Sequence, residues 1–182
     1  MAVEIGQRTQ VEGGGTVAIR QLGNDRTVAY THGPYLVMER VFDAPRELVW
    51  KVLHDPEKIP LWWGPRNVST TIAEHDVRVG GKWRWIAHSA EGDAPFKGEY
   101  LEVVPPERVV RTEIFDVPPF NEDPNGAAIE TMTLEDLGDG RTKLVSRSKF
   151  PSVEVLEGAL GTGMIGGALE SYDRLAEELA KG

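Results

Sequence analysis

Hydrophobic and polar residues alternate along most of this chain, which is the pattern of half-buried β-strands. The alternation predicts one strand at 35–42 and six more between 67 and 150, with glycine, proline and acidic residues in the turns between them. The six later segments are NVSTTIAEHDV, KWRWIAHS, FKGEYLEVV, RVVRTEIFD, IETMTLEDL and TKLVSRSKF. Because the connections are mostly short, we expect an antiparallel meander.

A four-residue hydrophobic spacing predicts a helix in DAPRELVWKVLH, directly after the first of these strands. Leu48 and Val52 lie four residues apart, so one face of the helix can be buried. Asp43 is placed to cap the first turn, where Pro45 is tolerated. The proline-rich segment DPEKIPLWWGP predicts a break after this helix.

A longer helix is predicted after Pro151, with Ser152 as its cap. Its buried face is expected to consist of Leu156, Leu160, Met164, Ala168, Tyr172, Leu175 and Leu179. Glycines occur within it at 158, 161, 163, 166 and 167, although each costs about 0.5–1 kcal/mol relative to alanine inside a helix. Either they let the helix approach a ligand or a moving lid, or the segment has a non-helical start, a break near 161–163, and a true helix over about residues 164–180.

The N-terminal residues 1–34 are rich in glycine and weakly patterned. Within them TVAIRQLGNDRTVAYTH has two alternating stretches around Gly23-Asn24-Asp25, which predicts a β-hairpin. We therefore divide the chain into an N-terminal extension, 1–34, and a main domain, 35–182, whose fold core we expect to be stable without the extension. The one long irregular stretch of the main domain, 116–128, is of a length that is usually functional or mobile.

The order strand, helix, meander, long helix favours one packing of an α+β fold. A curved antiparallel sheet of six to seven strands wraps around the long C-terminal helix, with the hairpin as an addition. A straight helix against a curved sheet leaves a gap, and such gaps are where ligands bind.

Composition narrows the possible functions. The chain has 182 residues and no cysteine, which excludes disulfides and thiolate chemistry. A formal charge of −9 without a lysine and arginine cluster argues against nucleic acid and anionic membranes as partners. No signal-peptide pattern and no apolar stretch of about 18 residues occurs, so we expect a cytoplasmic protein.

Motifs for metals and cofactors are missing from the sequence. His32, His54, His75 and His88 are spaced too widely for a helical metal pair, and Gly13–Gly15 lacks the lysine and helix of a phosphate-binding loop. No serine lies in a nucleophile elbow. We expect neither a metal nor a cofactor.

Several segments in order carry a resemblance to a known family. VFDAPRELVWKVLHDPEKIPLWWGP, DVRVGGKWRW, GEYLEVVPPERVV, LGDGRTKLVSRSKF and ESYDRLAEEL resemble bacterial proteins similar to the C-terminal domain of the activator of heat-shock protein 90 ATPase. That group lies in the START-related helix-grip (SRPBCC) superfamily, together with polyketide cyclases and lipid-transfer domains. The resemblance covers roughly residues 35–180 and implies the helix-grip fold.

The chain departs from the family pattern in ways that bear on function. Where relatives often have a tryptophan after the helix glycine, this chain has Ala168 after Gly167, which suggests a roomier cavity. The chaperone activator also has a separate N-terminal domain, which the 34-residue extension is too short to form. The hairpin in this extension extends the sheet or serves a partner.

Aromatic side chains on the strands and beside the helix are the first ligand-binding candidates. Trp83 and Trp85 share one strand face, opposite Lys82 and Arg84, and either line the cavity or only fill the core. The same two readings apply to Trp62-Trp63, whose indoles can close one end of a cavity. Gly98 leaves room for a ligand or for a neighbouring backbone.

A charged pair is the second candidate, because Arg111, Glu113 and Phe115 share one face of their strand. If this face is concave, the charges are buried, must be paired and are functional candidates. If it is convex, they form an ordinary solvated pair. The predicted ligand-binding residues are Trp63, Trp83, Trp85, Phe96, Tyr100, Arg111, Glu113, Phe115, Met132, Leu160, Met164, Ala168 and Tyr172.

Three functions remain open from the sequence. The first is binding of a small apolar or aromatic molecule between sheet and helix, by a monomer or a homodimer. The second is a polyketide-cyclase-like or hydrolase-like enzyme, with Glu113, His88 or Tyr100 as acid or base. The third is a chaperone-linked interaction protein, as the family resemblance implies.

Overall fold

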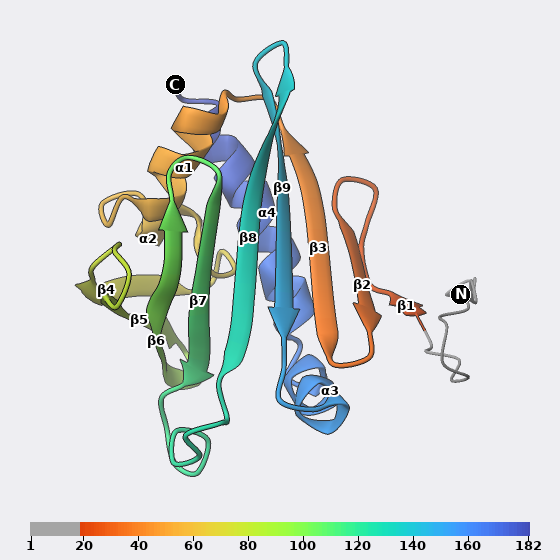
Figure 1. Cartoon of the computed structure of the whole chain (residues 1–182). Coiled ribbons are helices and arrows are strands. Elements are labelled where there is room, and N and C mark those ends of the chain that lie inside the picture. Colours follow the sequence, from red (N-terminus) through yellow and green to blue (C-terminus); the bar gives the residue numbers. More distant parts are fainter. Residues whose placement is uncertain (1–18) are drawn as a thin grey trace.

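Antiparallel strands form one curved sheet in the computed structural model, which describes residues 19–182 (Figure 1). In the sheet they are arranged β1-β2-β3-β9-β8-β7-β6-β5-β4. Their bounds are β1 Ile19–Gln21, β2 Val28–His32, β3 Tyr35–Phe42, β4 Ser69–His75, β5 Lys82–Ser89, β6 Gly92–Val104, β7 Arg108–Phe115, β8 Ala128–Gly138 and β9 Arg141–Lys149. The meander runs from β4 to β9 and returns to β3, which confirms the predicted α+β helix-grip fold.

The N-terminal hairpin is part of the same sheet. Ile19 of β1 pairs with His32 of β2, and β2 pairs along β3, so the sheet has nine strands rather than six or seven. Asn24 Oδ1 accepts the backbone N–H groups of Arg26 and Thr27 and holds the turn. The predicted hairpin is confirmed for residues 19–32, whereas Thr16, Val17 and Ala18 lie outside the described residues.

Helices cover the concave face of the sheet (Figure 1). Their bounds are α1 Arg46–His54, α2 Ile59–Trp62, α3 Val153–Gly161 and α4 Met164–Leu179. The predicted cap of the first helix was wrong, because α1 begins after Pro45 without a side-chain cap. The short α2 was not predicted, although Pro60 near its start needs no intrahelical N–H partner and is therefore tolerated there.

The predicted C-terminal helix is divided, so the interpretation with a break near 161–163 is correct. Its non-helical start was wrong, because residues 153–161 form α3. Ser152 Oγ accepts the Val155 N–H at 3.2 Å and caps α3, as predicted. Gly163 then adopts φ 83°, a left-handed conformation that costs glycine little, and α4 starts at the next residue. A side chain at Gly158 or Gly161 would meet no described residue within 4 Å, so close approach does not explain these two glycines.

The core lies between the concave face of the sheet, α1 and α4. Its most deeply buried large side chains include Trp83, Trp85, Tyr100, Phe42, Ile59, Leu144 and Leu175. Burial of such side chains supplies about 1.5–3 kcal/mol each and is the main driving force of the fold. Within residues 19–182, no helix has both the length and the apolar composition needed to cross a membrane.

Candidate functional site

Strand β7 places the charged side chain of Arg111 in the apolar core. Val109 and Arg111 alternate onto the concave face, with exposed fractions of 3% and 8%. The alternative of a solvated convex pair is therefore wrong for Arg111. Glu113, on the same face but closer to the end of the strand, keeps 34% of its side chain exposed.

Two carboxylates neutralise Arg111. Its Nε donates to Glu130 Oε2 at 2.8 Å, and its Nη2 donates to Glu113 Oε2 at 3.4 Å. Glu130 is fixed in turn by the Ser146 hydroxyl, which donates to Oε1 at 2.7 Å. A buried charge that lost these partners would cost several kcal/mol, so this cluster is a constrained feature of the interior.

The guanidinium of Arg111 also lies against two indoles. Its Cζ is 4.4 Å from the ring centroid of Trp83 and 4.8 Å from that of Trp85, within the range of cation–π attraction. The Trp83 Nε1–H donates to the Thr112 carbonyl at 3.1 Å, passing over Gly98. A Cβ at Gly98 would lie 1.8 Å from the Thr112 oxygen, so packing against backbone and indole explains this glycine.

Burial and charge shift the ionisation of this cluster. Burial alone would lower the pKa of Arg111, but the carboxylates of Glu130 and Glu113 outweigh burial and raise it. For Glu113, burial raises the pKa to about 7, against the lowering effect of the Arg111 charge. Because the side chain is one-third exposed, solvent weakens this shift.

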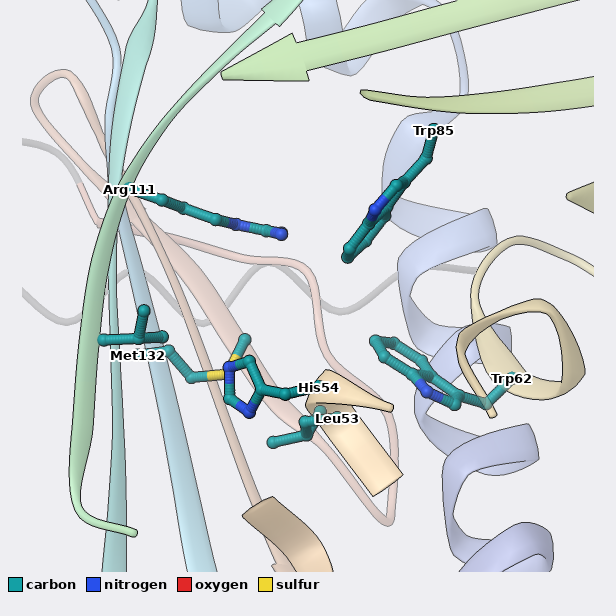
Figure 2. A pocket seen from close by; sticks show the side chains of 7 residues that line it. Leu53, His54, Trp62, Trp85, Arg111 and Met132 are labelled. Carbon is teal, nitrogen blue, oxygen red and sulfur yellow. The ribbon is translucent and has the colours of Figure 1, made fainter. Parts of the chain in front are cut away.

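Arg111 borders a small pocket at the centre of the molecule. The lining residues are Leu53, His54, Trp62, Trp85, Val109, Arg111 and Met132, contributed by α1, α2, β5, β7 and β8. Figure 2 shows Arg111 and Trp85 extending toward each other across the space, with His54 and Trp62 on one side of it. Its free volume of about 10 Å³ is room for about one water molecule. A larger ligand therefore requires lining side chains to move.

Two histidines have fixed orientations: His54, which lines the pocket, and His75, which packs against the lining residue Trp85. His54 Nδ1 lies 2.9 Å from the Trp50 carbonyl, and His75 Nε2 lies 2.8 Å from the His54 carbonyl. Because a carbonyl only accepts, each of these nitrogens carries the proton. Burial lowers the pKa of His54 to about 4, and burial also lowers that of His75. Both rings are therefore neutral at pH 7.

Three polar atoms near Arg111 are buried without a hydrogen-bond partner among the described residues: Trp85 Nε1, Tyr100 Oη and His75 Nδ1. The rings adjoin, since the His75 centroid is 5.8 Å from Trp85 and 6.2 Å from Tyr100. Burial raises the pKa of Tyr100, more than the Arg111 charge lowers it, so its hydroxyl stays protonated. Buried polar groups are rarely left unpaired, so these atoms need an explanation.

A chain of aromatic rings leads from the pocket to the surface. Trp63 packs edge-on against Trp85 and Phe96, with centroids 5.4 Å and 5.6 Å away. Phe96 contacts Phe115 at 5.4 Å, and Phe115 contacts Phe120 at 5.7 Å. Phe120 lies in the long 116–127 connection and is 60% exposed. Four of these rings were among the sequence-predicted ligand-binding residues, and the structure places them in one row.

The structure places the helical candidates elsewhere. Tyr172 is buried on α4 with its ring edge-on to Phe42 at 6.2 Å. Ala168 is half-buried against the core, while Leu160 on α3 and Met164 at the start of α4 are also half-buried. None of these four lines the central pocket. The space expected beside Ala168 is thus not part of it, and the pocket is small rather than roomy.

His88, considered above as an acid or base inside the cavity, faces the other way. Its Nε2 lies 2.9 Å from the Thr71 hydroxyl, and its Nδ1 lies 2.7 Å from the carboxylate of Asp93, in an exposed group on strands β4 to β6. His88 alternates with Trp85 along β5 and therefore lies on the opposite face of the sheet. This residue does not take part in chemistry in the pocket.

Sequence reasoning missed several residues of the site: Leu53, His54, Val109, Glu130 and His75, whose Nδ1 is an acceptor without a partner among the described residues. Trp62, which was considered as closing one end of a cavity, does line the pocket. A signal existed for Glu130, which alternates with the buried Met132 and Leu134 on strand β8 and is thus a charge on an apolar face. For His54, no sequence pattern marked the helix end as part of a pocket.

Comparison with known proteins establishes the family. Residues 43–180 match the family model of Activator of Hsp90 ATPase homolog 1-like protein, AHSA1. The chain belongs to this family. The AHSA1 match includes every residue that lines the pocket, whereas the hairpin and β3 lie before it. Among curated proteins, no relative matches this chain.

Solved structures confirm the AHSA1 fold. A protein from Arthrobacter aurescens, solved by NMR, is 25% identical with a TM-score of 0.73, over 82% of this chain and 87% of that one. Protein CV1439 from Chromobacterium violaceum is 28% identical with a TM-score of 0.66, over 80% and 96% of the two chains. An AHSA1 protein from Silicibacter pomeroyi is 24% identical with a TM-score of 0.63, over 80% and 97%.

Proposed function

We propose that this protein binds a small apolar or aromatic molecule in the pocket beside Arg111, as a cytoplasmic monomer or homodimer. The observation that carries the proposal is the pocket itself, which is enclosed by aromatic and aliphatic side chains with one charged group. Its closed state is compatible with binding, because Met132 is flexible and Trp63 lies in the irregular segment after α2. Movement of these side chains would enlarge the space along the row of aromatic rings.

Binding of a neutral fluorescent dye such as Nile red tests the proposal. We expect an affinity of about micromolar, near −8 kcal/mol. The variant Val109→Phe fills the pocket and should weaken dye binding at least about tenfold, which corresponds to about 1.4 kcal/mol. Val79→Phe is the matched control, since Val79 is 63% exposed, and it should bind as the unchanged protein does. Absence of dye binding, or equal loss in both variants, would reject a ligand site in this pocket.

A second candidate function, catalysis beside the pocket, is favoured by His75, which packs against the lining residue Trp85. The lone pair of His75 Nδ1 has no hydrogen-bond partner among the described residues, and the lowered pKa of the imidazole keeps the ring neutral at pH 7. His75 therefore has the properties of a general base. Tyr100 is a neighbouring proton donor. A cyclase-like or hydrolase-like reaction on the bound molecule would use these two groups rather than His88. Conversion of a bound candidate substrate that is lost in His75→Gln would favour the enzyme over the binding protein.

A further inference from the structure

Two of the three unpartnered polar atoms are hydrogen-bond donors in the driest part of the molecule. Trp85 is 2% exposed and Tyr100 is 1% exposed. An indole N–H can only donate, and the protonated Tyr100 hydroxyl donates as well. A buried donor without an acceptor costs about 1–3 kcal/mol, so the folded protein gains when something supplies that acceptor.

No described residue supplies this acceptor, since even His75 Nδ1, the unpartnered acceptor next to both rings, forms no hydrogen bond with either donor. The other two core indoles, Trp62 and Trp83, donate to the carbonyls of Val52 and Thr112 at 3.1 Å. Trp85 lines the pocket beside Arg111, as Trp62 does, but its indole N–H has no such carbonyl. Figure 2 shows its indole extending into the space between Arg111 and Trp62, where a bound molecule would reach it.

The charges of the site restrict what this molecule can be. Arg111 already has two carboxylate partners, so an anionic ligand would add a further negative charge beside Glu130 and Glu113. An ammonium ligand brings donors only and cannot satisfy an indole N–H. A neutral group with a free oxygen lone pair meets both conditions.

We infer that the pocket takes a neutral aromatic ligand that bears a carbonyl oxygen, with Trp85 and Tyr100 as the donors to that oxygen. This inference rests on the proposed function and adds the polar group that the ligand must carry. The aromatic ring would lie among Trp62, Trp63 and Trp85. A ligand of the same shape without the oxygen would leave these buried donors unpaired, so it should bind more weakly.

Acetophenone and ethylbenzene form a shape-matched pair for the test, since they differ by a carbonyl in place of a methylene group. An apolar pocket without donors favours the more hydrophobic ethylbenzene. We expect the full chain to bind acetophenone about tenfold more tightly, as one hydrogen bond made in a dry site provides. In ¹⁵N–¹H spectra the Trp85 indole resonance should move downfield with acetophenone, while those of Trp62 and Trp83, already bonded, serve as internal references.

Substitutions assign the preference to the two donors. Trp85→Phe identifies the indole resonance by its disappearance and should bring the affinity ratio of the two compounds below one. Tyr100→Phe removes a single oxygen and should reduce the ratio several-fold, so it tests the inference even where Trp85→Phe does not fold. Tyr35→Phe is the matched control. Tyr35 lies on β3, where its ring packs against Arg147 of β9 and not in the pocket, so this substitution should leave the ratio unchanged.

The outcomes distinguish failure of the carbonyl inference from failure of the proposed binding function. Equal binding of the two compounds, or tighter binding of ethylbenzene, overturns the carbonyl inference and leaves an apolar binding site. A preference for acetophenone that survives in both Trp85→Phe and Tyr100→Phe also overturns it. If neither compound binds, both the inference and the proposed function are wrong.

Discussion

His54 connects the pocket to the acid stability of the protein. Burial is the main cause of its low pKa, about 4, and the Arg111 charge lowers it further. In the unfolded chain the imidazole has a pKa of about 6.5. Between these two values the unfolded state binds a proton that the folded state does not, so the stability due to neutral His54 is complete above pH 6.5 and is lost as the pH falls toward 4.

We therefore predict that the free energy of unfolding attributable to His54 falls by about 2 kcal/mol between pH 7.5 and pH 5. Urea unfolding of the unchanged protein and of His54→Gln at both pH values measures it as the difference between the two proteins. The difference is needed because other groups also change the free energy of unfolding over this range. The contribution of His75 changes in the same direction as that of His54, whereas the raised pKa of Glu113 makes its contribution fall as the pH rises from about 4.5 to about 7. Parallel pH profiles for the two proteins would contradict the prediction.

At the scale of elements, Arg174 holds the segment that carries Trp62 and Trp63. From α4 its guanidinium donates to the carbonyls of Gly64 at 2.7 Å and Pro65 at 3.2 Å, with longer contacts of 3.4 Å to Trp63 and Pro60. Ser171 of the same helix accepts the Gly64 N–H at 2.9 Å. One helix thus fixes the irregular segment at the side of the pocket.

We predict that Arg174→Met lowers the free energy of unfolding by about 1.5–3 kcal/mol, the range for hydrogen bonds to a charged group. Backbone amide exchange should become faster mainly in residues 59–66, because the loss is local. Arg66→Met is the matched control, since Arg66 forms an exposed ion pair with Glu177 and its loss should lower the free energy of unfolding much less. Equal effects of the two substitutions would show that the carbonyl contacts of Arg174 do not stabilise the segment.

The elements show where sequence reasoning succeeds and where it stops. The strands of the meander were predicted because alternation and turn residues are local signals. Helix α2 was not, because it has only four residues, one of them Pro60, and so short a segment shows no periodicity. The face of β7 could not be decided either, since alternation puts Arg111 and Val109 together but does not say which side is the core until β8 brings Glu130 opposite.

The size of the pocket was beyond the sequence for a different reason. Ala168 is a small residue on α4, from which a roomier cavity was predicted, but free volume depends on how all neighbours pack. Ala168 lies against the core, and the pocket that remains is enclosed by Trp62, Trp85 and Met132 from other elements. A single residue therefore could not predict where, or whether, space is left.

For the whole molecule, the hairpin raises the question of where the domain begins. The hairpin contributes buried positions, with Ala29 of β2 at 0% exposure and Thr27, directly before β2, at 1%. It also contributes an ion pair across to α4, in which Arg26 Nη2 lies 3.1 Å from Asp173. The family match and the helices that close the core nevertheless lie beyond residue 42.

We predict that a chain starting at Gly33 still unfolds cooperatively, but with a free energy of unfolding lower by about 2–4 kcal/mol from the loss of buried apolar area and hydrogen bonds. Its β3 becomes an edge strand with unpaired backbone groups, so we also expect self-association to rise with concentration. Urea unfolding followed by circular dichroism, together with size-exclusion chromatography, measures both effects. The substitution Val28→Thr, at a 52% exposed position of β2, is the control and should change stability by less than about 0.5 kcal/mol. A shortened chain without a cooperative transition would mean that the hairpin completes the domain and that the domain begins before β3.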